Sequence, residues 1–344
     1  MYDNLFQPIQ IGSTTIPNRI VRTAHSTGHL WVDSGKSLIS YHEARARGGV
    51  GMSILEIGGV HMSSPSIIPA FADFVMDGYQ KLADAMAPHG MKLFQQLWHG
   101  GSAAPLNIMG GPLWSASDVP NPQNGLVPVP MTQGMIDEIV EAFAAGARRV
   151  LGGGLDGVEI HGAHGYLVGQ FLSPLTNKRT DGYGGSIEAR MRFPLEVLRV
   201  VREIWPEDKP ISARISAIDW EKGGNTIEDG IEMSKMLFDA GLDIVDVSSG
   251  NVTGERRPEL PGLFQAPFSE AIRKATGKPT MTVGNIKSAA EINDVIATGR
   301  ADICCLARWH LYDPYFVRHA AHEQGVDPNW PKQYLNVRRM LAQP

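Results

Sequence analysis

Eight short apolar segments recur along the chain, and a stretch with the periodicity of an amphipathic helix follows most of them. The segments lie at residues 19–24, 51–57, 92–98, 156–162, 211–216, 243–249, 280–284 and 302–307. A helical pattern such as MIDEIVEAFAAGARRVLGGG begins near Thr or Asp and ends in Gly, as helix caps require. Strands that alternate with helices indicate a parallel sheet. Eight such units in roughly 300 residues predict an α/β fold of the (β/α)8 TIM-barrel type.

The N-terminal stretch IQIGSTTIPN precedes the first of these strands. Its two short apolar runs around Gly12 predict a hairpin, which we expect to close the bottom of the barrel. The 344 residues are 43% hydrophobic, enough for a large core. No Pro-rich or Ser-rich linker divides them, so we expect a single domain over residues 1–344.

Charge and cysteine content restrict the class of protein. The formal net charge is −5, and Lys and Arg form no continuous stripe, which argues against nucleic acid as a partner. The N-terminus lacks a signal-peptide pattern, and no run approaches the ~18 apolar residues of a membrane span. Cys304 and Cys305 are adjacent, so an intrachain disulfide is not expected. We expect a reduced, cytoplasmic protein that acts on a small molecule, without nucleic-acid or membrane partners.

The segment EIHGAHGYLVGQFLSP places His161, His164 and Tyr166 directly after the fourth predicted strand. Active sites of TIM barrels lie at the carboxyl ends of the strands. The histidine pair lacks the acidic partner of an HExxH zinc motif, so we predict no metal site. Two interpretations remain: a structural pair of histidines, or two N–H donors that bind a substrate oxygen.

If the two histidines bind a substrate oxygen, the type of reaction can be inferred. Two imidazole N–H groups on a carbonyl oxygen would stabilise enolate charge as it develops. A phenol, whose ordinary pKa is about 10, can protonate a carbanion at neutral pH. Such a reaction needs an electron source that side chains cannot supply but a flavin can.

The turns after the seventh and eighth predicted strands form a candidate phosphate site. TVGNIKSAAEI offers a Gly turn with Ser288 as a helix cap, and LARWHLYDP adds Arg308. Barrels often bind phosphate here through backbone N–H groups and a helix N-terminus. Ordinary strand-to-helix turns also use Gly, so this pattern alone does not distinguish a phosphate site from an ordinary turn.

The stretch EIHGAHGYLVGQFLSPLTNKRTDGYGGSIEARMRF resembles the signature of the old yellow enzyme family of FMN-dependent ene-reductases. It is also similar to the barrel domains of 2,4-dienoyl-CoA reductase and trimethylamine dehydrogenase. The segments IPNRIVRTA, FQQLWHGG, ARISAIDW, TVGNI and GRADICCLAR have counterparts in the same order. The resemblance therefore covers nearly the whole chain.

The resemblance implies noncovalent FMN, with NADH or NADPH as the reductant. Thr23, Ala24, His25 and Ser26 would lie along the flavin ring, and Gln96 would bind its pyrimidine edge. Arg214 would lie near N1 and O2, where reduced flavin is negative. The phosphate would be held by Gly284, Asn285, Ala307 and Arg308.

The resemblance also assigns the substrate side. His161 and His164 would bind a substrate carbonyl oxygen, and Tyr166 would donate the proton. We therefore expect reduction of an activated C=C bond of the enone or enoyl type. A homo-oligomer is compatible with the sequence.

Several positions depart from the family pattern, and three of them bear on the flavin and the substrate pocket. Ser26 stands where trimethylamine dehydrogenase attaches its flavin through Cys, which predicts that the flavin is not covalently bound here. His25 replaces the usual Met, and Gly28 replaces a Tyr that lines the pocket. These last two keep an oxidative alternative open, in which a flavin-dependent amine dehydrogenase or N-demethylase acts on an N-methyl substrate.

One long segment, residues 100–130, shows no regular pattern. A loop of this length in a barrel is normally functional. Trp114 lies within it, and we expect the segment either to cover the site or to form a surface flap.

Overall fold

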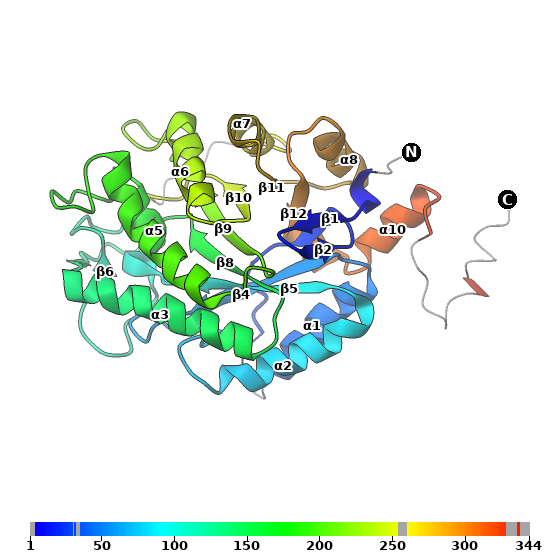
Figure 1. Ribbon diagram of the computed structural model, residues 1–344, viewed down its shortest axis with the longest axis horizontal. Helices are drawn as coiled ribbons and strands as arrows, with labels where there is room; N and C mark the ends of the chain where they lie inside the picture. The colour runs from blue at the N-terminus through cyan, green and yellow to red at the C-terminus, as the bar shows by residue number, and fades with distance from the viewer. Residues whose placement is uncertain (1–3, 30, 32–34, 254–259, 328–335, 338–344) are drawn as a thin grey trace.

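A closed barrel of eight parallel strands forms the centre of the protein in the computed structural model, which describes residues 4–29, 31, 35–253, 260–327 and 336–337 (Figure 1). The strand order around the barrel is β3-β4-β5-β8-β9-β10-β11-β12. The strands are β3 (Ile20–Arg22), β4 (Met52–Gly59), β5 (Lys92–Trp98), β8 (Gly157–Gly162), β9 (Ile211–Ser216), β10 (Ile244–Ser248), β11 (Thr280–Val283) and β12 (Ile303–Leu306). Each lies within or overlaps one of the eight predicted segments, so the TIM-barrel prediction is confirmed.

Helices surround the barrel and cover the outer face of the sheet (Figure 1). The α-helices are α1 (Lys36–Arg47), α2 (Val75–Met86), α3 (Gln133–Gly152), α4 (Leu167–Leu172), α5 (Ile187–Ile204), α6 (Ile227–Asp239), α7 (Ala266–Thr276), α8 (Ala289–Ala297), α9 (Arg308–Tyr312) and α10 (Phe316–Glu323). The described residues also contain the short 3-10 helices η1 (Asn4–Phe6), η3 (Ala87–His89) and η4 (Gly101–Ala103). Because both faces of the sheet are covered, strands such as β8, β9 and β10 are buried at every residue, which explains their continuous apolar character.

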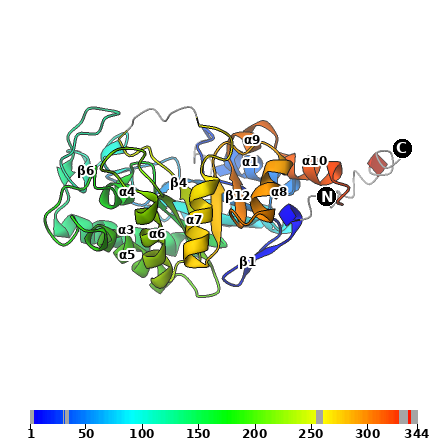
Figure 2. The ribbon, with the colours of Figure 1, turned by 90° about the horizontal axis from the view of Figure 1, so that it is seen from above.

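The predicted hairpin is present and closes one end of the barrel. Strands β1 (Ile9–Ile11) and β2 (Thr14–Ile16) pair antiparallel. Ile11 and Ile16 are buried in one apolar cluster with barrel residues that include Met52, Phe94 and Met281. Figure 2 shows β1 at the lower edge of the molecule, whereas α9 and β6 lie toward the opposite edge.

The segment from residue 100 to residue 130 is more ordered than its sequence suggests. It contains η4 and two short strands, β6 (Trp114–Ser115) and β7 (Val129–Pro130), which pair in parallel. Trp114 stacks on His99 with a centroid separation of 6.5 Å and lies 5.5 Å from His61. The segment is thus anchored to the barrel by this aromatic group.

No helix in the part of the chain that the structure describes is long and apolar enough to cross a membrane.

The hairpin contact predicts a measurable contribution to stability. Ile16→Ala removes a fully buried side chain and should lower the free energy of unfolding by about 2–5 kcal/mol. Thr15→Ala, at an exposed position of the same strand, should change it by less than about 0.5 kcal/mol. Urea denaturation followed by tryptophan fluorescence measures both. Equal effects would show that the hairpin does not pack on the barrel core as described.

Candidate active site

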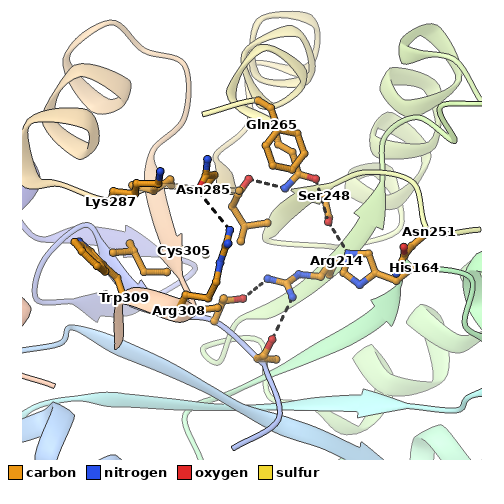
Figure 3. A pocket seen from close by; sticks show the side chains of 18 residues that line it. His164, Arg214, Ser248, Asn251, Gln265, Asn285, Lys287, Cys305, Arg308 and Trp309 are labelled. Carbon is orange, nitrogen blue, oxygen red and sulfur yellow. Dashed lines mark hydrogen bonds between the residues drawn. The ribbon is translucent and has the colours of Figure 1, made fainter. Parts of the chain in front are cut away.

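A cavity of about 460 Å³ opens at the carboxyl ends of the barrel strands. Its walls come from β3, β8, β9 and β10 and from the turns after β11 and β12 (Figure 3). The volume is typical of small-molecule sites. Eight of the predicted site residues line it: Thr23, Ala24, His164, Arg214, Gly284, Asn285, Ala307 and Arg308. The five that do not line it are His25, Ser26, Gln96, His161 and Tyr166.

Arg214 lies at the floor of the cavity and is held by bonds to two other strands. Its Nε donates to Asp246 Oδ2 at 2.7 Å, and one terminal nitrogen lies 2.6 Å from the same oxygen. That nitrogen also donates to Thr23 Oγ1, and the other lies 3.5 Å from the Ala24 carbonyl oxygen (Figure 3). Burial lowers the pKa of Arg214, but Asp246 and Glu159 outweigh it, so the pKa lies above its ordinary value. Arg214 is therefore a fixed cation facing the cavity.

Asp246 and Glu159 were missed by sequence reasoning. Both are charged residues inside otherwise apolar strands, in DIVDVSS and DGVEIHG, and that contrast was the available signal. Gln96, predicted to bind the flavin edge, instead donates from Nε2 to Glu159 Oε1 at 2.8 Å. Its side chain is 1% exposed. This layer lies below the cavity rather than in its wall.

The turns after β11 and β12 form the end of the cavity predicted to hold phosphate. Gly284 has φ of 125°, and a Cβ there would come within 2.8 Å of Gln265 Nε2. Arg308 approaches Asn285 Oδ1 at 3.4 Å, and Lys287 lies beside them (Figure 3). Glycine is required here because both the backbone conformation and the close approach exclude a side chain.

The capping residues of α8 occupy part of its N-terminus at this end of the cavity. Ser288 caps the helix as predicted, and the capping contacts use three backbone N–H groups. Glu291 Oε2 accepts from the backbone N–H groups of Lys287 and Ser288 at 2.6 and 3.2 Å, and Ser288 Oγ accepts from the N–H of Glu291. These three N–H groups are therefore not available to a phosphate. The Arg308 side chain and the other backbone N–H groups of the two turns remain as donors.

The charges of the cavity wall are all positive. Arg214, Lys287 and Arg308 line it, and no carboxylate does so among the described residues. Such a wall suits a ligand with a phosphate at one end and a group that becomes negative at the other. FMN has both features, and the residues present therefore fit it.

The three side chains of the HGAHGY motif lie together at the side of the cavity. The rings of His161 and His164 are 5.3 Å apart, and those of His161 and Tyr166 are 5.1 Å apart. Trp98 packs on the other side of Tyr166 at 5.2 Å. The structure thus brings the predicted trio together, with His164 in the wall and the other two behind it.

Protonation states follow from burial. Burial, with smaller effects of His164 and Arg214, holds the pKa of His161 well below its ordinary value, so this imidazole is neutral. Its Nδ1 accepts from the Ala163 N–H at 3.4 Å, which places the proton on Nε2. Burial raises the pKa of Tyr166, so the phenol keeps its proton at neutral pH. His161 and Tyr166 are both N–H or O–H donors.

His164 is fixed by backbone and side-chain contacts. It has φ of 60°, and its N–H donates to Ser216 Oγ at 3.1 Å. Its Nε2 lies 2.6 Å from Ser248 Oγ, which also donates to Gln265 Oε1 at 3.2 Å (Figure 3). Ser248 and Gln265 line the cavity but were not predicted, because neither carries a sequence signal of its own.

His25 turns away from the cavity. Its Nδ1 donates to the Thr23 carbonyl oxygen at 2.7 Å, and its Nε2 lies 3.2 Å from Tyr41 Oη. Burial, followed by the charge of Arg22, lowers the pKa of His25 to about 3, so the ring is neutral. Ser26 is exposed. These two residues are placed at the end of β3 as predicted, but the structure gives neither a place in the cavity wall.

His99 also lies outside the cavity. Its Nδ1 accepts from the Gly101 N–H at 3.1 Å, and its Nε2 contacts Ser63 Oγ at 2.8 Å. Both nitrogens are thus used within the protein. No group of three or more His, Cys, Asp or Glu that could hold a metal ion occurs in the described ranges.

Fold and site together define a TIM-barrel oxidoreductase with a cavity suited to a flavin mononucleotide. Residues 4–326 match the model of the family described as NADH:flavin oxidoreductase / NADH oxidase. The chain belongs to this family, as its resemblance to the old yellow enzymes predicted. It is an FMN-dependent NAD(P)H oxidoreductase.

Two relatives show how far the similarity extends. A "NADH oxidase" of Thermoanaerobacter brockii is 40% identical over 333 residues, which are 93% of this chain and 51% of the relative. A "NADPH dehydrogenase" of Geobacillus sp. (strain WCH70) is 38% identical, over 96% of this chain and 97% of the relative. The chain therefore spans about half of the first and nearly all of the second.

Solved structures include both reductive and oxidative enzymes. A complex of 2-naphthoyl-CoA reductase with 2-naphthoyl-CoA has a TM-score of 0.87 at 28% identity, covering 95% of this chain and 53% of that chain. Histamine dehydrogenase from Rhizobium sp. 4-9 has a TM-score of 0.83 at 26% identity, covering 94% and 48%. This chain spans about half of each.

If the positive end of the cavity holds the phosphate of FMN, the affinity for FMN should depend on Arg308. Arg308→Ala should raise the FMN dissociation constant about 10–100-fold, because a hydrogen bond to a charged group contributes about 1.5–3 kcal/mol. Arg300→Ala, which removes an arginine bonded to Asp294 outside the cavity, should leave it unchanged. Flavin fluorescence quenching by the apoprotein measures both. FMN binding by Arg308→Ala with unchanged affinity would place the phosphate elsewhere.

Proposed function

We propose that the enzyme uses NAD(P)H to reduce an activated C=C bond conjugated to a carbonyl group. The observation that carries the proposal is the neutral, protonated Tyr166 packed on the neutral His161 beside the cavity. Bound FMN would supply the hydride chemistry. The Thr23–Ala24 segment and Arg214 would hold its ring, and Gly284, Asn285, Ala307 and Arg308 its phosphate.

His161 and His164 are proposed to bind the substrate carbonyl oxygen. His161, a neutral imidazole with its proton on Nε2, is a donor without a net charge, and such a donor stabilises negative charge on oxygen as that charge develops. Ser248 holds the ring of His164 from behind. The His25 side chain is proposed to act only on the shape of the β3 end, because its two ring nitrogens contact the Thr23 carbonyl oxygen and Tyr41 Oη.

Tyr166 is proposed to donate the proton that completes the reduction. Its pKa is raised by burial, so it does not lose the proton to solvent at neutral pH. Trp98 and His161 fix the ring from two sides. A positioned acid of this kind contributes about 10²–10⁴-fold to a rate.

An oxidative function is the second candidate, and the similarity to histamine dehydrogenase favours it. Gly28 also leaves open space, because a Cβ there would meet no atom within 4 Å. However, an ammonium substrate would enter a cavity whose charged wall residues in the described chain are all cations. The electrostatics therefore favour a carbonyl substrate.

The roles proposed for His161, His164 and Tyr166 predict that substitutions of these residues affect different steps of the reaction. Tyr166→Phe should leave substrate affinity nearly unchanged and slow reoxidation of the flavin by an enone or enoyl thioester by about 10²–10⁴-fold. His161→Ala and His164→Ala should each weaken substrate binding and slow reoxidation by about 10²–10³-fold, because each removes an oxyanion donor. Reduction by NAD(P)H should barely change in Tyr166→Phe. Stopped-flow absorbance of the flavin separates the two half-reactions.

Tyr315→Phe is the matched control, since Tyr315 lies outside the cavity wall. Unchanged reoxidation in Tyr166→Phe, with a substrate that the wild type reduces, would assign the proton to another group. Fast flavin reduction by an amine, with no alkene that reoxidises it, would replace the reductive function by the oxidative one.

A further inference from the structure

A layer of polar side chains fills the barrel interior directly below the cavity. Five inward-facing residues on four strands form it, and each is at most 4% exposed. They are Gln96 on β5, Glu159 on β8, Ser212 and Arg214 on β9, and Asp246 on β10. Glu159 is in register with Gln96 on one side and Ser212 on the other, and Arg214 is in register with Asp246. The layer therefore holds two carboxylates and a single cation.

The single cation, Arg214, forms its ion pair with Asp246 and not with Glu159. Both short contacts of the Arg214 guanidinium with a carboxylate go to Asp246 Oδ2. Among the described residues, the hydrogen-bond donors to Glu159 are neutral: Oε1 accepts from Gln96 Nε2 at 2.8 Å, and Oε2 accepts from Ser212 Oγ at 3.2 Å. Asp246 Oδ1 is buried without a hydrogen-bond partner among the described residues. When both carboxylates are ionised, the layer thus has a net charge of −1, because Arg214 neutralises only one of them.

An unbalanced buried charge favours proton binding. Burial, and then the charge of Asp246, raise the pKa of Glu159 to about 7, although Arg214, Gln96 and Ser212 oppose them. Burial also raises the pKa of Asp246. Glu159, which accepts from the neutral Gln96 and Ser212 while Asp246 is paired with Arg214, is the carboxylate of the layer that more readily takes a proton.

The other groups around Glu159 do not exchange protons in this range. Arg214 on β9 stays charged, and His161 on β8 stays neutral. Cys305 on β12 is influenced by Glu159, and burial holds its pKa well above the ordinary value, so it remains a thiol. Gln96 on β5 and Ser212 on β9 do not titrate. Only the two carboxylates on β8 and β10 can change charge.

We propose that Glu159 is a redox-linked proton site: it binds one proton from solvent when the bound flavin gains two electrons and releases it when the electrons leave. Arg214 connects the two events, because one side of its guanidinium faces the cavity above it and the other side lies against the carboxylate layer below it. Negative charge gained by the flavin beside Arg214 offsets the attraction of this cation for Glu159. Glu159 then holds a proton more tightly, and the proton keeps the net charge of the barrel interior constant.

The electrons and protons of this step balance without a further reactant. Reduction by NAD(P)H brings two electrons and one proton as hydride, and the additional proton comes from water and binds the Glu159 carboxylate. The proposal rests on FMN binding alone and not on the direction of the proposed reaction. It can therefore fail or succeed independently of the ene-reductase function.

The test counts protons. The holoenzyme is reduced anaerobically with dithionite in weak buffer between pH 6 and 8, and proton uptake per flavin is measured with a pH indicator after correction for the reductant. The wild type should bind between one and two protons per two electrons, with the excess over one largest near neutral pH. The absorption spectrum of the reduced flavin shows whether its own N1 is protonated, which separates that proton from the one on Glu159.

Glu159→Gln is the decisive variant, since the amide keeps the shape of the side chain. Its oxygen can accept from Gln96, and Ser212 Oγ, which lies 3.3 Å from the Val158 carbonyl oxygen, can donate there instead. The variant should bind one proton per flavin over the whole range. Glu141→Gln, at an exposed surface position, should behave as the wild type. A wild type limited to one proton at every pH would overturn the proposal, as would equal uptake in Glu159→Gln.

A second readout does not depend on the variant retaining FMN. The infrared difference spectrum between the oxidised and reduced wild type, recorded with ¹³C-labelled glutamate, should gain the C=O band of a protonated carboxylic acid on reduction. Its absence would contradict the proposal even if Glu159→Gln failed to fold. Where the variant holds FMN, the band should be lost.

Discussion

The contact of Arg214 with Asp246 and Thr23 is the interaction on which the site depends. Strand β9, which carries Arg214, and strand β3, which leads into Thr23, lie opposite one another in the ring of eight. The guanidinium therefore crosses the barrel below the cavity. A buried guanidinium needs a carboxylate partner and filled hydrogen bonds, and Asp246 on the neighbouring strand provides the former. One side chain thus sets the floor of the cavity and its charge.

Positive and negative side chains occupy different levels of the barrel at the site. The cavity wall contains cations alone among its described charged residues, and the carboxylates lie one layer below. A flavin in the cavity would meet positive charge at its phosphate and at the part of the ring that becomes electron-rich. The carboxylates below moderate this charge. The neutral His161 and Tyr166 stand at the side and supply donors without adding charge.

The sequence predicted the elements more completely than their contacts. The eight strands and the hairpin could be predicted because burial on both faces leaves continuous apolar runs, and Gly12 marks the turn. The His161–Tyr166 cluster could be predicted because its members are close in the chain. The partner of Arg214 and the outward turn of His25 could not. Each depends on which side chain a distant strand or helix presents, and that is fixed only in the folded barrel.

The midpoint potential of the bound flavin in Arg214→Met, compared with the wild type, tests the central claim most directly. If Arg214 is the cation beside the electron-rich part of the ring, its loss disfavours the reduced state, and the potential should fall. Arg214→Lys, which keeps the charge without the fork of donors, should fall less. Dye-coupled anaerobic titration gives all three values. A potential unchanged in Arg214→Met at full FMN occupancy would show that the flavin does not depend on this guanidinium, and the account of the site would be wrong.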